Sequence, residues 1–488
     1  MEPEQIKKLR QWAIDQSEFS ILLKISQEVG ADIFLVGGSI RDRLLKMETR
    51  DVDLTLSGQA LKAAGIFADR TGGTFVLLRE EGEMARVVLR DRTFDFAVFR
   101  GPDLEADLRG RDFTINAISL SLAQAFSQGD WVPYDPLNGI QDLQDKVLRM
   151  TSPDCFQQDP LRMLRAFRLT AQLGLTIDPE TMRAIKKSAP ILIRSAPERI
   201  HYEWMTLLSQ PVSFIAVQAM EEVGLFKCLF PEMDPLKGIS QDRYHHLDVF
   251  RHSLLTFRCL EELIQKEIPL PGDLAAEISS YLKQNRKAAW LKWAALFHDL
   301  GKAATEGEKA GHRTFYGHAE TSQKQFGLIA IRYCSSAREK KFIEQMIGWH
   351  MNPFYLVQEG YKKTLTRRAV IRFVRMIGEE LNGIFLLALA DSLAAQGKEK
   401  PEDLEDRLVD LWRQSLSVRD EIIRPWQGTP PLVSGKDLIE LGLTPGPLFK
   451  TVLSEIQEAQ WEGKISSREE ALEWIKMRLN PAIRNPQS

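Results

Sequence analysis

Phe34-Leu-Val-Gly-Gly-Ser-Ile-Arg-Asp42, followed closely by Arg50-Asp-Val-Asp-Leu-Thr55, is the most informative part of this sequence. The apolar run from Ile33 to Val36 predicts a short buried strand. The strand ends in Gly37-Gly38, where a backbone without side chains can approach a phosphate group closely. Residues 39–46 favour a helix, whose free N–H groups and dipole would face the same point.

Asp51 and Asp53 are predicted to lie on one face of an extended segment, because residues i and i+2 of a strand point the same way. Side by side, the two carboxylates would repel each other unless a cation lay between them. A phosphate cradle beside a divalent-metal pair favours nucleotidyl transfer. Each element alone is common, since Gly-Gly is often only a turn and Asp-x-Asp is often a solvated strand end.

Composition and charge are those of an ordinary globular protein, with 44% hydrophobic and 27% charged residues and a net charge of −3. The length of 488 residues suits about three domains. No stretch approaches the roughly 20 apolar residues of a membrane span, and the N-terminus lacks a signal-peptide core. The four cysteines have no paired spacing, which favours buried, reduced thiols. We therefore expect a cytoplasmic protein with no membrane segment.

The distribution of strand and helix signals predicts an α+β protein. Short β-like runs at 33–36, 74–78, 86–89 and 93–99 mix with helical segments up to about residue 148. After Met150, long periodic stretches predict helix almost throughout. Residues 1–30 predict a single amphipathic helix.

A second group of charged residues follows in Asp107-Leu-Arg-Gly-Arg-Asp-Phe-Thr-Ile-Asn-Ala117. Arg109 and Arg111 suit a triphosphate, because arginine is always charged and binds oxyanions bidentately, although surface ion pairs are the alternative. Asp95 lies between two phenylalanines of a predicted strand. It is either a third metal ligand or a residue that faces solvent.

The segment Gln157-Gln-Asp-Pro-Leu-Arg-Met-Leu-Arg-Ala-Phe-Arg168 predicts a helix that begins at Asp159-Pro160, with the aspartate as N-cap. Arg162, Arg165 and Arg168 recur every third residue, with apolar residues between them. Three arginines on so apolar a helix would be costly without anionic partners, which a nucleotide would supply.

Six segments together resemble the class II tRNA nucleotidyltransferases, the family of CCA-adding enzymes and bacterial poly(A) polymerases. They follow the family's order within residues 30–205: Gly37-Gly-Ser-Ile-Arg-Asp42, Asp51-Val-Asp53, Arg111-Asp-Phe-Thr-Ile-Asn-Ala117, Asp135-Pro-Leu-Asn-Gly139, Asp159-Pro-Leu-Arg-Met-Leu-Arg-Ala166 and Pro197-Glu-Arg199. The resemblance implies template-independent addition of C, A or both to tRNA 3′ ends from CTP and ATP.

The resemblance also implies a role for each matching residue. Asp51 and Asp53 would be the catalytic residues and would bind two Mg²⁺ ions. The nucleotide would contact Gly37, Gly38, Arg41, Arg111, Asp159, Arg162, Arg165 and Arg168. Within that set, the residues of the head would hold the triphosphate, and those of the later helix would read the base.

Base reading by Asp159 and Arg162 is chemically reasonable. Cytosine and adenine both present an exocyclic amine to a carboxylate and an adjacent ring nitrogen to an arginine. Uracil and guanine present a carbonyl instead of the amine, and an unpaired buried polar group costs roughly 1–3 kcal/mol. Gln158 departs from the family, which usually has an acidic residue there. Residues 71–86 resemble a flexible loop used when the added base changes from C to A, with an ordinary hairpin as the alternative.

The helical half carries a second candidate site built from four of the eight histidines and two aspartates: His252, His298, Asp299, His318, His350 and Asp391. Imidazole and carboxylate ligands together suit Mn, Fe, Ni, Co or Mg rather than a structural zinc. The pattern resembles the HD phosphohydrolase domain over about residues 242–395, with room for a second metal. This resemblance implies hydrolysis of 2′,3′-cyclic or terminal phosphates, and an inactive helical scaffold is the alternative.

The resemblances predict four domains: a catalytic head (1–148), a neck that binds base and RNA (149–238), an HD-like domain (239–396) and a tRNA-binding tail (397–488). A local basic stretch would suit RNA phosphates, although a solvated helix face is the other interpretation. It contains Lys362, Lys363, Arg367, Arg368, Arg372 and Arg375.

Three alternatives share parts of this pattern. An A-adding or a CC-adding specialist would carry the same motifs. A poly(A) polymerase would share the head but fits the HD-type ligands less well. A metallophosphohydrolase that used the head only to bind RNA would not need the intact pair Asp51 and Asp53. The sequence does not predict the oligomeric state.

Overall fold

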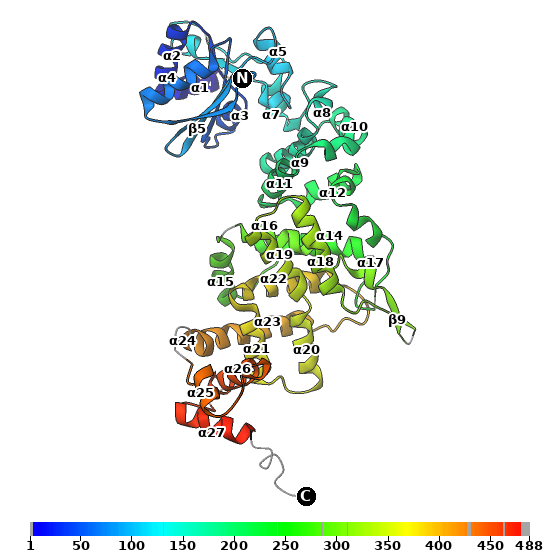
Figure 1. Ribbon diagram of the computed structural model, residues 1–488. Coiled ribbons are helices and arrows are strands. Elements are labelled where there is room, and N and C mark those ends of the chain that lie inside the picture. Colours follow the sequence, from blue (N-terminus) through cyan, green and yellow to red (C-terminus); the bar gives the residue numbers. More distant parts are fainter. Residues whose placement is uncertain are drawn as a thin grey trace, which may run out of the picture. The chain divides into compact units, whose positions relative to one another are not determined.

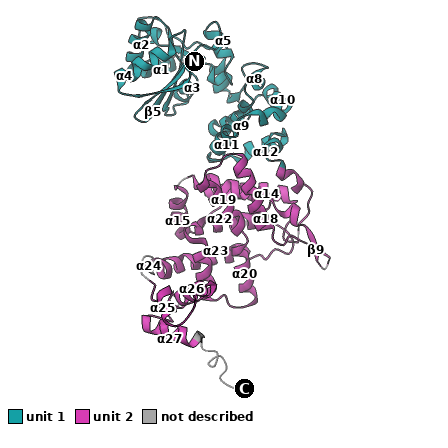
Figure 2. Ribbon diagram, viewed as in Figure 1, with its two compact units in different colours: residues 1–231 teal, residues 232–488 magenta. Residues whose placement is uncertain are grey.

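The structure is a computed structural model, and it describes residues 3–129, 131–241, 243–284, 286–309, 311–426, 431–461 and 464–479. The chain divides into two compact units, residues 1–231 and residues 232–488 (Figure 2). The first unit contains a sheet with helices, and the second is almost entirely helical (Figure 1). The mixed content confirms the predicted α+β class.

A six-stranded mixed sheet forms the centre of the head. Its strands are β1 (Ile33–Val36), β2 (Asp51–Leu56), β3 (Thr74–Arg79), β4 (Met84–Leu89), β5 (Arg92–Val98) and β6 (Ser119–Ser121). They lie in the order β3-β4-β5-β2-β1-β6, with β2 and β5 parallel and the other neighbours antiparallel. The four predicted strands and the extended Asp51 segment are confirmed, whereas β6 was not predicted.

The helices of the head lie on both faces of this sheet. They are α1 (Pro3–Asp15), α2 (Ser17–Val29), α3 (Gly38–Leu44), α4 (Ala60–Thr71), α5 (Leu104–Arg109), α6 (Leu122–Ala125) and α7 (Gly139–Gln144). Helix α4 packs on β3, β4 and β5, and Leu108 of α5 packs with Val36 on the face that also carries Asp53. Phe67 of α4 packs on Phe94 and Phe96 of β5. The single helix predicted for residues 1–30 is wrong, because Gln16 adopts extended backbone angles that separate α1 from α2.

The rest of the first unit is a helical neck with one small strand pair, β7 (Val147–Leu148) and β8 (Thr176–Ile177). Its helices are α8 (Cys155–Gln158), α9 (Leu161–Leu173), α10 (Pro179–Ser188), α11 (Pro197–Leu208), α12 (Phe214–Glu222) and α13 (Leu225–Leu229). Helix α9 packs on α11, and a buried cluster of Trp204, Phe226 and Phe230 forms the core beside them.

The second unit is built around the buried helix α22 (Leu381–Ala394), whose sequence is apolar on every side. The surrounding helices are α14 (Val249–Gln265), α15 (Gly272–Leu282), α16 (Lys287–Phe297), α17 (Lys302–Thr305), α18 (His318–Arg332), α19 (Ala337–Trp349), α20 (Asn352–Lys362), α21 (Arg367–Ile377), α23 (Leu404–Ser417) and α24 (Arg424–Trp426). A hairpin of β9 (Gly307–Lys309) and β10 (His312–Thr314) interrupts the helical half that the sequence predicts.

The C-terminal segment has a hydrophobic core of its own. Its helices are α25 (Gly435–Glu440), α26 (Pro447–Trp461) and α27 (Arg468–Leu479). Leu438, Val452, Ile456 and Ile475 are among the buried residues of this core. Of the boundary predicted at Pro425–Pro431, residues 427–430 lie outside the described residues.

No helix of the described chain combines the length and the apolar character that crossing a bilayer requires. The four cysteines are free thiols, as predicted. Cys155 and Cys259 are buried, Cys228 is half-buried, and Cys334 is exposed, so the expectation of burial is wrong for Cys334.

Candidate functional site

The first candidate site lies where β1 turns into α3. Gly37 has φ of +76°, which an L side chain rarely adopts, and a Cβ atom there would lie 2.6 Å from Oδ2 of Asp53. The backbone N–H of Gly38 donates a hydrogen bond to the same carboxylate. The Gly-Gly pair therefore lets the backbone close directly over Asp53.

The two predicted metal ligands lie side by side on β2. Asp51 is exposed, and its Oδ1 accepts a hydrogen bond from the hydroxyl of Thr93 on β5. Asp53 is half-buried, and burial raises the pKa of its carboxyl, with the charges of Asp95 and Asp51 adding to the effect. Arg111 opposes this shift in pKa. Carboxylates placed this close together fit a divalent cation, which would compensate their charge.

Asp95 is paired with an arginine and does not face solvent alone. It lies opposite Asp53 in the β2–β5 register and opposite Arg86 in the β4–β5 register. Nε and Nη2 of Arg86 donate to its two carboxylate oxygens, both at 2.7 Å. In the structure Asp95 is therefore neither a free metal ligand nor a side chain that simply faces solvent, because Arg86 balances its charge.

Arg41 and Arg111 both reach the glycine turn. Arg41 is buried, donates to Asp42 and to Oδ1 of Asn116, and would lie 3.3 Å from a Cβ atom on Gly38. Arg111 forms an ion pair of 3.0 Å with Asp107. These contacts hold two guanidinium groups beside the turn where a triphosphate is predicted.

Asp159 lies at the entry to α9, between two partners. Its Oδ1 accepts from the N–H of Leu161 at 3.2 Å, which resembles the predicted capping contact, and its Oδ2 lies 2.8 Å from Nη2 of Arg199. Arg162 donates to the backbone carbonyls of Gly110 and Arg111 at 2.8 and 3.0 Å. The pair predicted to read the base is therefore joined to the head by Arg162 and to α11 by Asp159.

Arg165 and Arg168 have protein carboxylates as partners. Arg165 contacts Asp112 at 3.1 Å and Glu203 at 3.0 Å, and Nε of Arg168 lies 2.5 Å from Glu203. Burial alone would raise the pKa of Asp112, but Arg165 and Asn116 lower it to about 2. The expectation that a nucleotide must balance these arginines is therefore wrong for Arg165 and Arg168, because Asp112 and Glu203 already do so.

Residues 71–86 form the end of α4, strand β3, a short turn and the start of β4, which is the hairpin alternative. All six residues of β3 are exposed, including the apolar Phe75, Leu77 and Leu78. Strand β3 is also an edge strand of the sheet.

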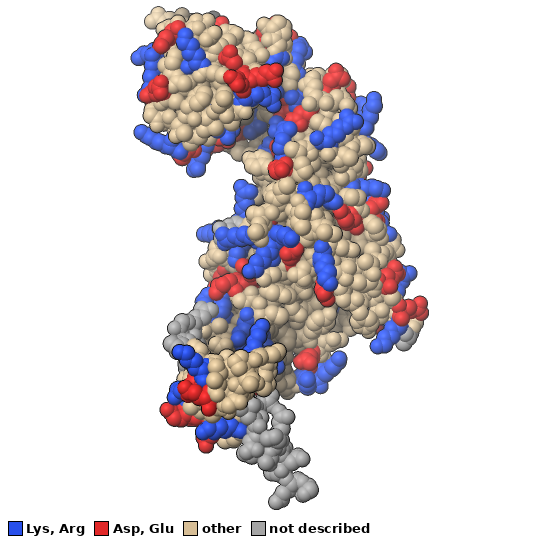
Figure 3. All heavy atoms as spheres, in the orientation of Figure 1, with Lys and Arg blue, Asp and Glu red and all other residues tan. Residues whose placement is uncertain are grey.

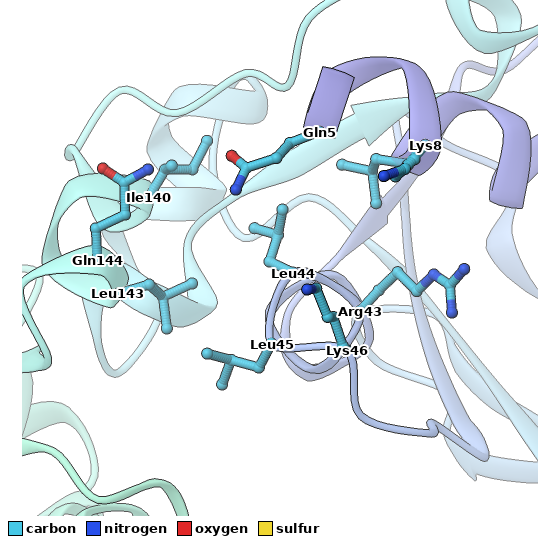
Figure 4. Close-up of a pocket in the computed structure, with 10 residues that line it drawn as sticks. Gln5, Lys8, Arg43, Leu44, Leu45, Lys46, Ile140, Leu143 and Gln144 are labelled. Carbon is cyan, nitrogen blue, oxygen red and sulfur yellow. The ribbon is translucent and has the colours of Figure 1, made fainter. Parts of the chain in front are cut away.

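A cavity of about 330 Å³ opens at the C-terminal end of α3, opposite the glycine turn (Figure 4). It is lined by Gln5, Lys8, Leu9, Arg43, Leu44, Leu45, Lys46, Ile140, Leu143 and Gln144. None of the predicted site residues belongs to this lining.

The second candidate site lies inside the helical unit. The structure brings together all six predicted ligands, each of them buried: His252, His298, Asp299, His318, His350 and Asp391. Oδ2 of Asp299 faces Nε2 of His298 at 3.1 Å, and its Oδ1 faces Nε2 of His318 at 3.3 Å. Nε2 of His252 lies 2.9 Å from Oδ1 of Asp391. Asp299 is thus placed between two ligand groups, which fits a pair of metal ions.

Hydrogen bonds orient three of the histidines toward the centre of the cluster. Nδ1 of His298, His318 and His350 lies 2.6–2.9 Å from the carbonyl oxygen three residues earlier in each case. A donor at Nδ1 leaves Nε2 as the acceptor that a metal requires. Nε2 of His298 and both oxygens of Asp299 make no hydrogen bond among the described residues, although Nζ of Lys302 lies 2.7 Å from Oδ2.

The charges inside this cluster are strongly coupled. Burial lowers the pKa of His252 to about 4 and, together with the neighbouring His298, that of His350 to about 3. Burial acts on His298 in the same direction, but Asp299 and Asp391 raise its pKa to about 10. Buried imidazoles and carboxylates in such proximity fit a divalent metal, because they are the ligand types that such ions bind.

His245 is a candidate ligand that the sequence interpretation missed. Its ring packs edge-on against His252 with centroids 4.6 Å apart, and its ligand atom lies within 4.8 Å of those of His252 and Asp391. His245 lies seven residues before His252 in the sequence. It stands next to His246, and the sequence offers no feature that distinguishes the two histidines.

The basic stretch on α21 contacts the C-terminal segment. Arg368 and Arg372 both donate to Oε2 of Glu458 on α26, and Arg375 stacks over the ring of Trp461. With Lys363, which forms an ion pair with Glu359, four of the six basic residues have protein partners. On the face shown in Figure 3, Lys and Arg are interspersed with Asp and Glu, so any RNA contact would depend on local groups and not on net charge.

Comparisons with known proteins match three successive regions of the chain. Residues 33–149 match the poly A polymerase head domain, residues 174–237 the probable RNA and SrmB-binding site of polymerase A, and residues 249–412 the HD domain. These matches, with the fold, define a nucleotidyltransferase that carries an HD domain.

Curated relatives cover most of the chain. An A-adding tRNA nucleotidyltransferase of Deinococcus radiodurans is 32% identical over 450 residues, which is 91% of this chain and 94% of the relative. A CC-adding tRNA nucleotidyltransferase of Thermus thermophilus is 30% identical, over 90% of this chain and 92% of the relative. The chain belongs to the family of tRNA nucleotidyltransferases.

Solved structures share the fold. A Thermotoga maritima CCA-adding enzyme complexed with tRNA has a TM-score of 0.63 at 20% identity, covering 97% of this chain and 98% of its own. A CCA-adding enzyme in complex with CTP has a TM-score of 0.65 at 21% identity, with the same coverage. The resemblance to this family, which the sequence motifs predict, is therefore confirmed.

Proposed function

We propose that this chain adds C, A or both to the 3′ end of tRNA, using CTP and ATP and no nucleic-acid template. The terminal ribose hydroxyl attacks the α-phosphate, and pyrophosphate leaves. The observation that carries this proposal is the closure of the Gly37–Gly38 backbone over Asp53, with Asp51 beside it. The names of the curated relatives, which add A or CC, support the same substrate class.

The residues of the head would divide the work at the triphosphate. Divalent ions such as Mg²⁺, held by Asp51 and Asp53, supply electrostatic stabilisation of the charge on the reacting phosphate. The N–H groups in the first turn of α3, apart from that of Gly38, which donates to Asp53, would donate to phosphate oxygens. Arg41 and Arg111 would hold the same group from the protein side.

Asp159 and Arg162 would select the base. Asp159 can accept a hydrogen bond from the exocyclic amine of C or A, while Arg199 keeps its carboxylate in place. Gln158, which lies 3.4 Å from Nη1 of Arg162, would influence how that guanidinium is presented. Arg165 and Arg168 would act through α9, since Asp112 and Glu203 fix them.

A second activity, hydrolysis of a phosphoester, is proposed for the HD centre. The complete ligand set and the Nδ1 hydrogen bonds that aim three imidazoles inward favour a working metal centre over an inactive scaffold. A divalent ion such as Mn, Ni, Co or Mg would supply Lewis-acid chemistry there. A cyclic or terminal phosphate at an RNA end is the substrate class that suits a tRNA-processing chain, and the cytoplasm is the compartment we propose.

One extension experiment tests the first activity and separates its variants. The full chain with Mg²⁺ is offered three tRNA transcripts: one without the terminal CCA, one that ends in CC, and one complete. Completion of the shortest transcript from CTP plus ATP would establish a CCA-adding enzyme. Addition of A only to the CC transcript, or of two C only to the shortest, would identify a specialist. Long homopolymeric A tails would identify a poly(A) polymerase, and no addition to any transcript would contradict the proposal.

A further inference from the structure

Asp95, the third carboxylate beside Asp51 and Asp53, forms an ion pair with Arg86 on the neighbouring strand β4. Arg86, Asp95 and Asp53 are successive partners across β4, β5 and β2, so their side chains lie in one row on one face of the sheet. Both oxygens of Asp95 accept from Arg86 at 2.7 Å. The contact is bidentate, which is the strongest and most directional form of an arginine–carboxylate pair.

This pair stands beside the carboxylates that would hold the metal ions. Asp51 and Asp53 face neither a lysine nor an arginine in a comparable bidentate contact among the ion pairs of the described residues. Asp95 would add a third negative charge to the row if Arg86 were absent. More ligand charge raises the affinity of a site for divalent cations. Arg86 therefore controls how much negative charge the site presents.

We infer that Arg86 is a positioning residue, which holds Asp95 in an ion pair and keeps it from binding metal in the absence of nucleotide. This inference rests on the proposed function, because it assumes that Asp51 and Asp53 bind divalent ions. Arg86 also belongs to β4, which carries the exposed hairpin with β3. The pair thus links the hairpin to the metal-binding row by one contact.

The test measures metal binding separately in the head and in the HD domain. Fe²⁺ with ascorbate and peroxide cuts the backbone near bound iron, and the fragment masses distinguish cleavage near residue 52 from cleavage in the second unit. Mg²⁺ is then added as a competitor to the full-length chain without nucleotide. The readout is the Mg²⁺ concentration that halves cleavage near residue 52.

Arg86→Met should lower this Mg²⁺ concentration by about three- to tenfold, because Asp95 becomes free to act as a further ligand. The double variant Arg86→Met with Asp95→Asn removes the pair without changing net charge, and it should stay within about twofold of the wild type. Arg70→Met is the matched control, since Arg70 is about as exposed as Arg86 and forms an ion pair with Glu28 in the same domain.

The outcomes separate this inference from the proposed function. An unchanged value in a folded Arg86→Met variant overturns the inference. So does a double variant that loses head cleavage as fully as Asp53→Asn, because Asp95 would then be a ligand. Absence of cleavage near residue 52 in the wild type, or an unaffected Asp53→Asn variant, contradicts the metal site itself. A purely structural role would lower the melting temperature and leave the Mg²⁺ value unchanged.

Discussion

A Cβ atom on Gly37 would lie 2.6 Å from Oδ2 of Asp53, so the carboxylate fills the space that a side chain at position 37 would need. The same glycine has a positive φ of 76°. Two independent requirements, backbone conformation and space, therefore select glycine at this position. The backbone can close over the carboxylate only because neither requirement is violated.

Gly37→Ala should abolish nucleotide addition, because the methyl group would displace Asp53. Alanine at the backbone angles of Gly37, φ 76° and ψ −144°, should also cost roughly 1–3 kcal/mol of stability, because residues with a side chain rarely adopt them. Gly378→Ala separates the two effects, since Gly378 has similar backbone angles, φ 61° and ψ −131°, and nothing within 4 Å of a Cβ atom. Extension assays and thermal melting of both variants check this prediction. Equal loss of activity in the two variants would show that strain alone is responsible.

Asp51→Ala and Asp53→Ala should each abolish nucleotide addition while the chain stays folded. Without one carboxylate the site loses ligand charge for a divalent ion. Asp91→Ala, in the exposed turn before β5, is the control and should keep the wild-type rate. Circular dichroism verifies folding. Wild-type rates in either site variant would refute the assignment of the metal ligands.

Asp112 should contribute pH-dependent stability to the first unit. Its pKa falls from the ordinary 3.8 to about 2 in the fold, so the ionised carboxylate stabilises the folded state above pH 4. That contribution, about 2 kcal/mol, should disappear as the pH falls from about 4 to about 2. The melting temperature of Asp112→Asn should therefore lie below that of the wild type at pH 7 and approach it at pH 2–3. A constant difference across this range would contradict the prediction.

Arg199→Ala should weaken base selection more than catalysis. Arg199 holds Oδ2 of Asp159 at 2.8 Å, and a mobile carboxylate would accept less selectively from the exocyclic amine. We expect the preference in kcat/KM for CTP or ATP over UTP or GTP to fall by roughly tenfold. This factor corresponds to about 1.4 kcal/mol, the size of one hydrogen bond to the exocyclic amine. Arg194→Ala, an exposed neighbour in the same unit, provides the comparison. Unchanged preferences with a lower rate would assign Arg199 to general stability.

His298→Ala should remove metal and any phosphohydrolase activity from the HD centre and leave nucleotide addition intact. Nε2 of His298 faces both Asp299 and Asp391, so the substitution removes the imidazole that lies between these two carboxylates. Metal content by mass spectrometry, hydrolysis of a 2′,3′-cyclic phosphate and tRNA extension would be measured on the same preparation. His312→Ala on the exposed hairpin is the control. Loss of addition together with hydrolysis would contradict two separate sites.

Local sequence signals identified most of the site residues. The Gly-Gly turn, the Asp-x-Asp strand and the opening of α9 depend on backbone geometry within a few residues, and such geometry is encoded locally. The HD-type ligands were likewise readable from their residue types and order, with His298 and Asp299 at the end of the apolar helix α16. The break at Gln16 was not, since both flanking segments carry helical periodicity.

The sequence by itself determined which residue types stand at each turn, strand and helix end, and hence the family and the class of chemistry. Only the tertiary structure decided the partners of the charges. Asp95 pairs with Arg86, Glu203 with Arg165 and Arg168, and Glu458 with Arg368 and Arg372. These pairs join residues that are 9 to 90 positions apart. Electrostatic attraction depends on distance in space, and sequence separation does not reveal that distance until the chain has folded.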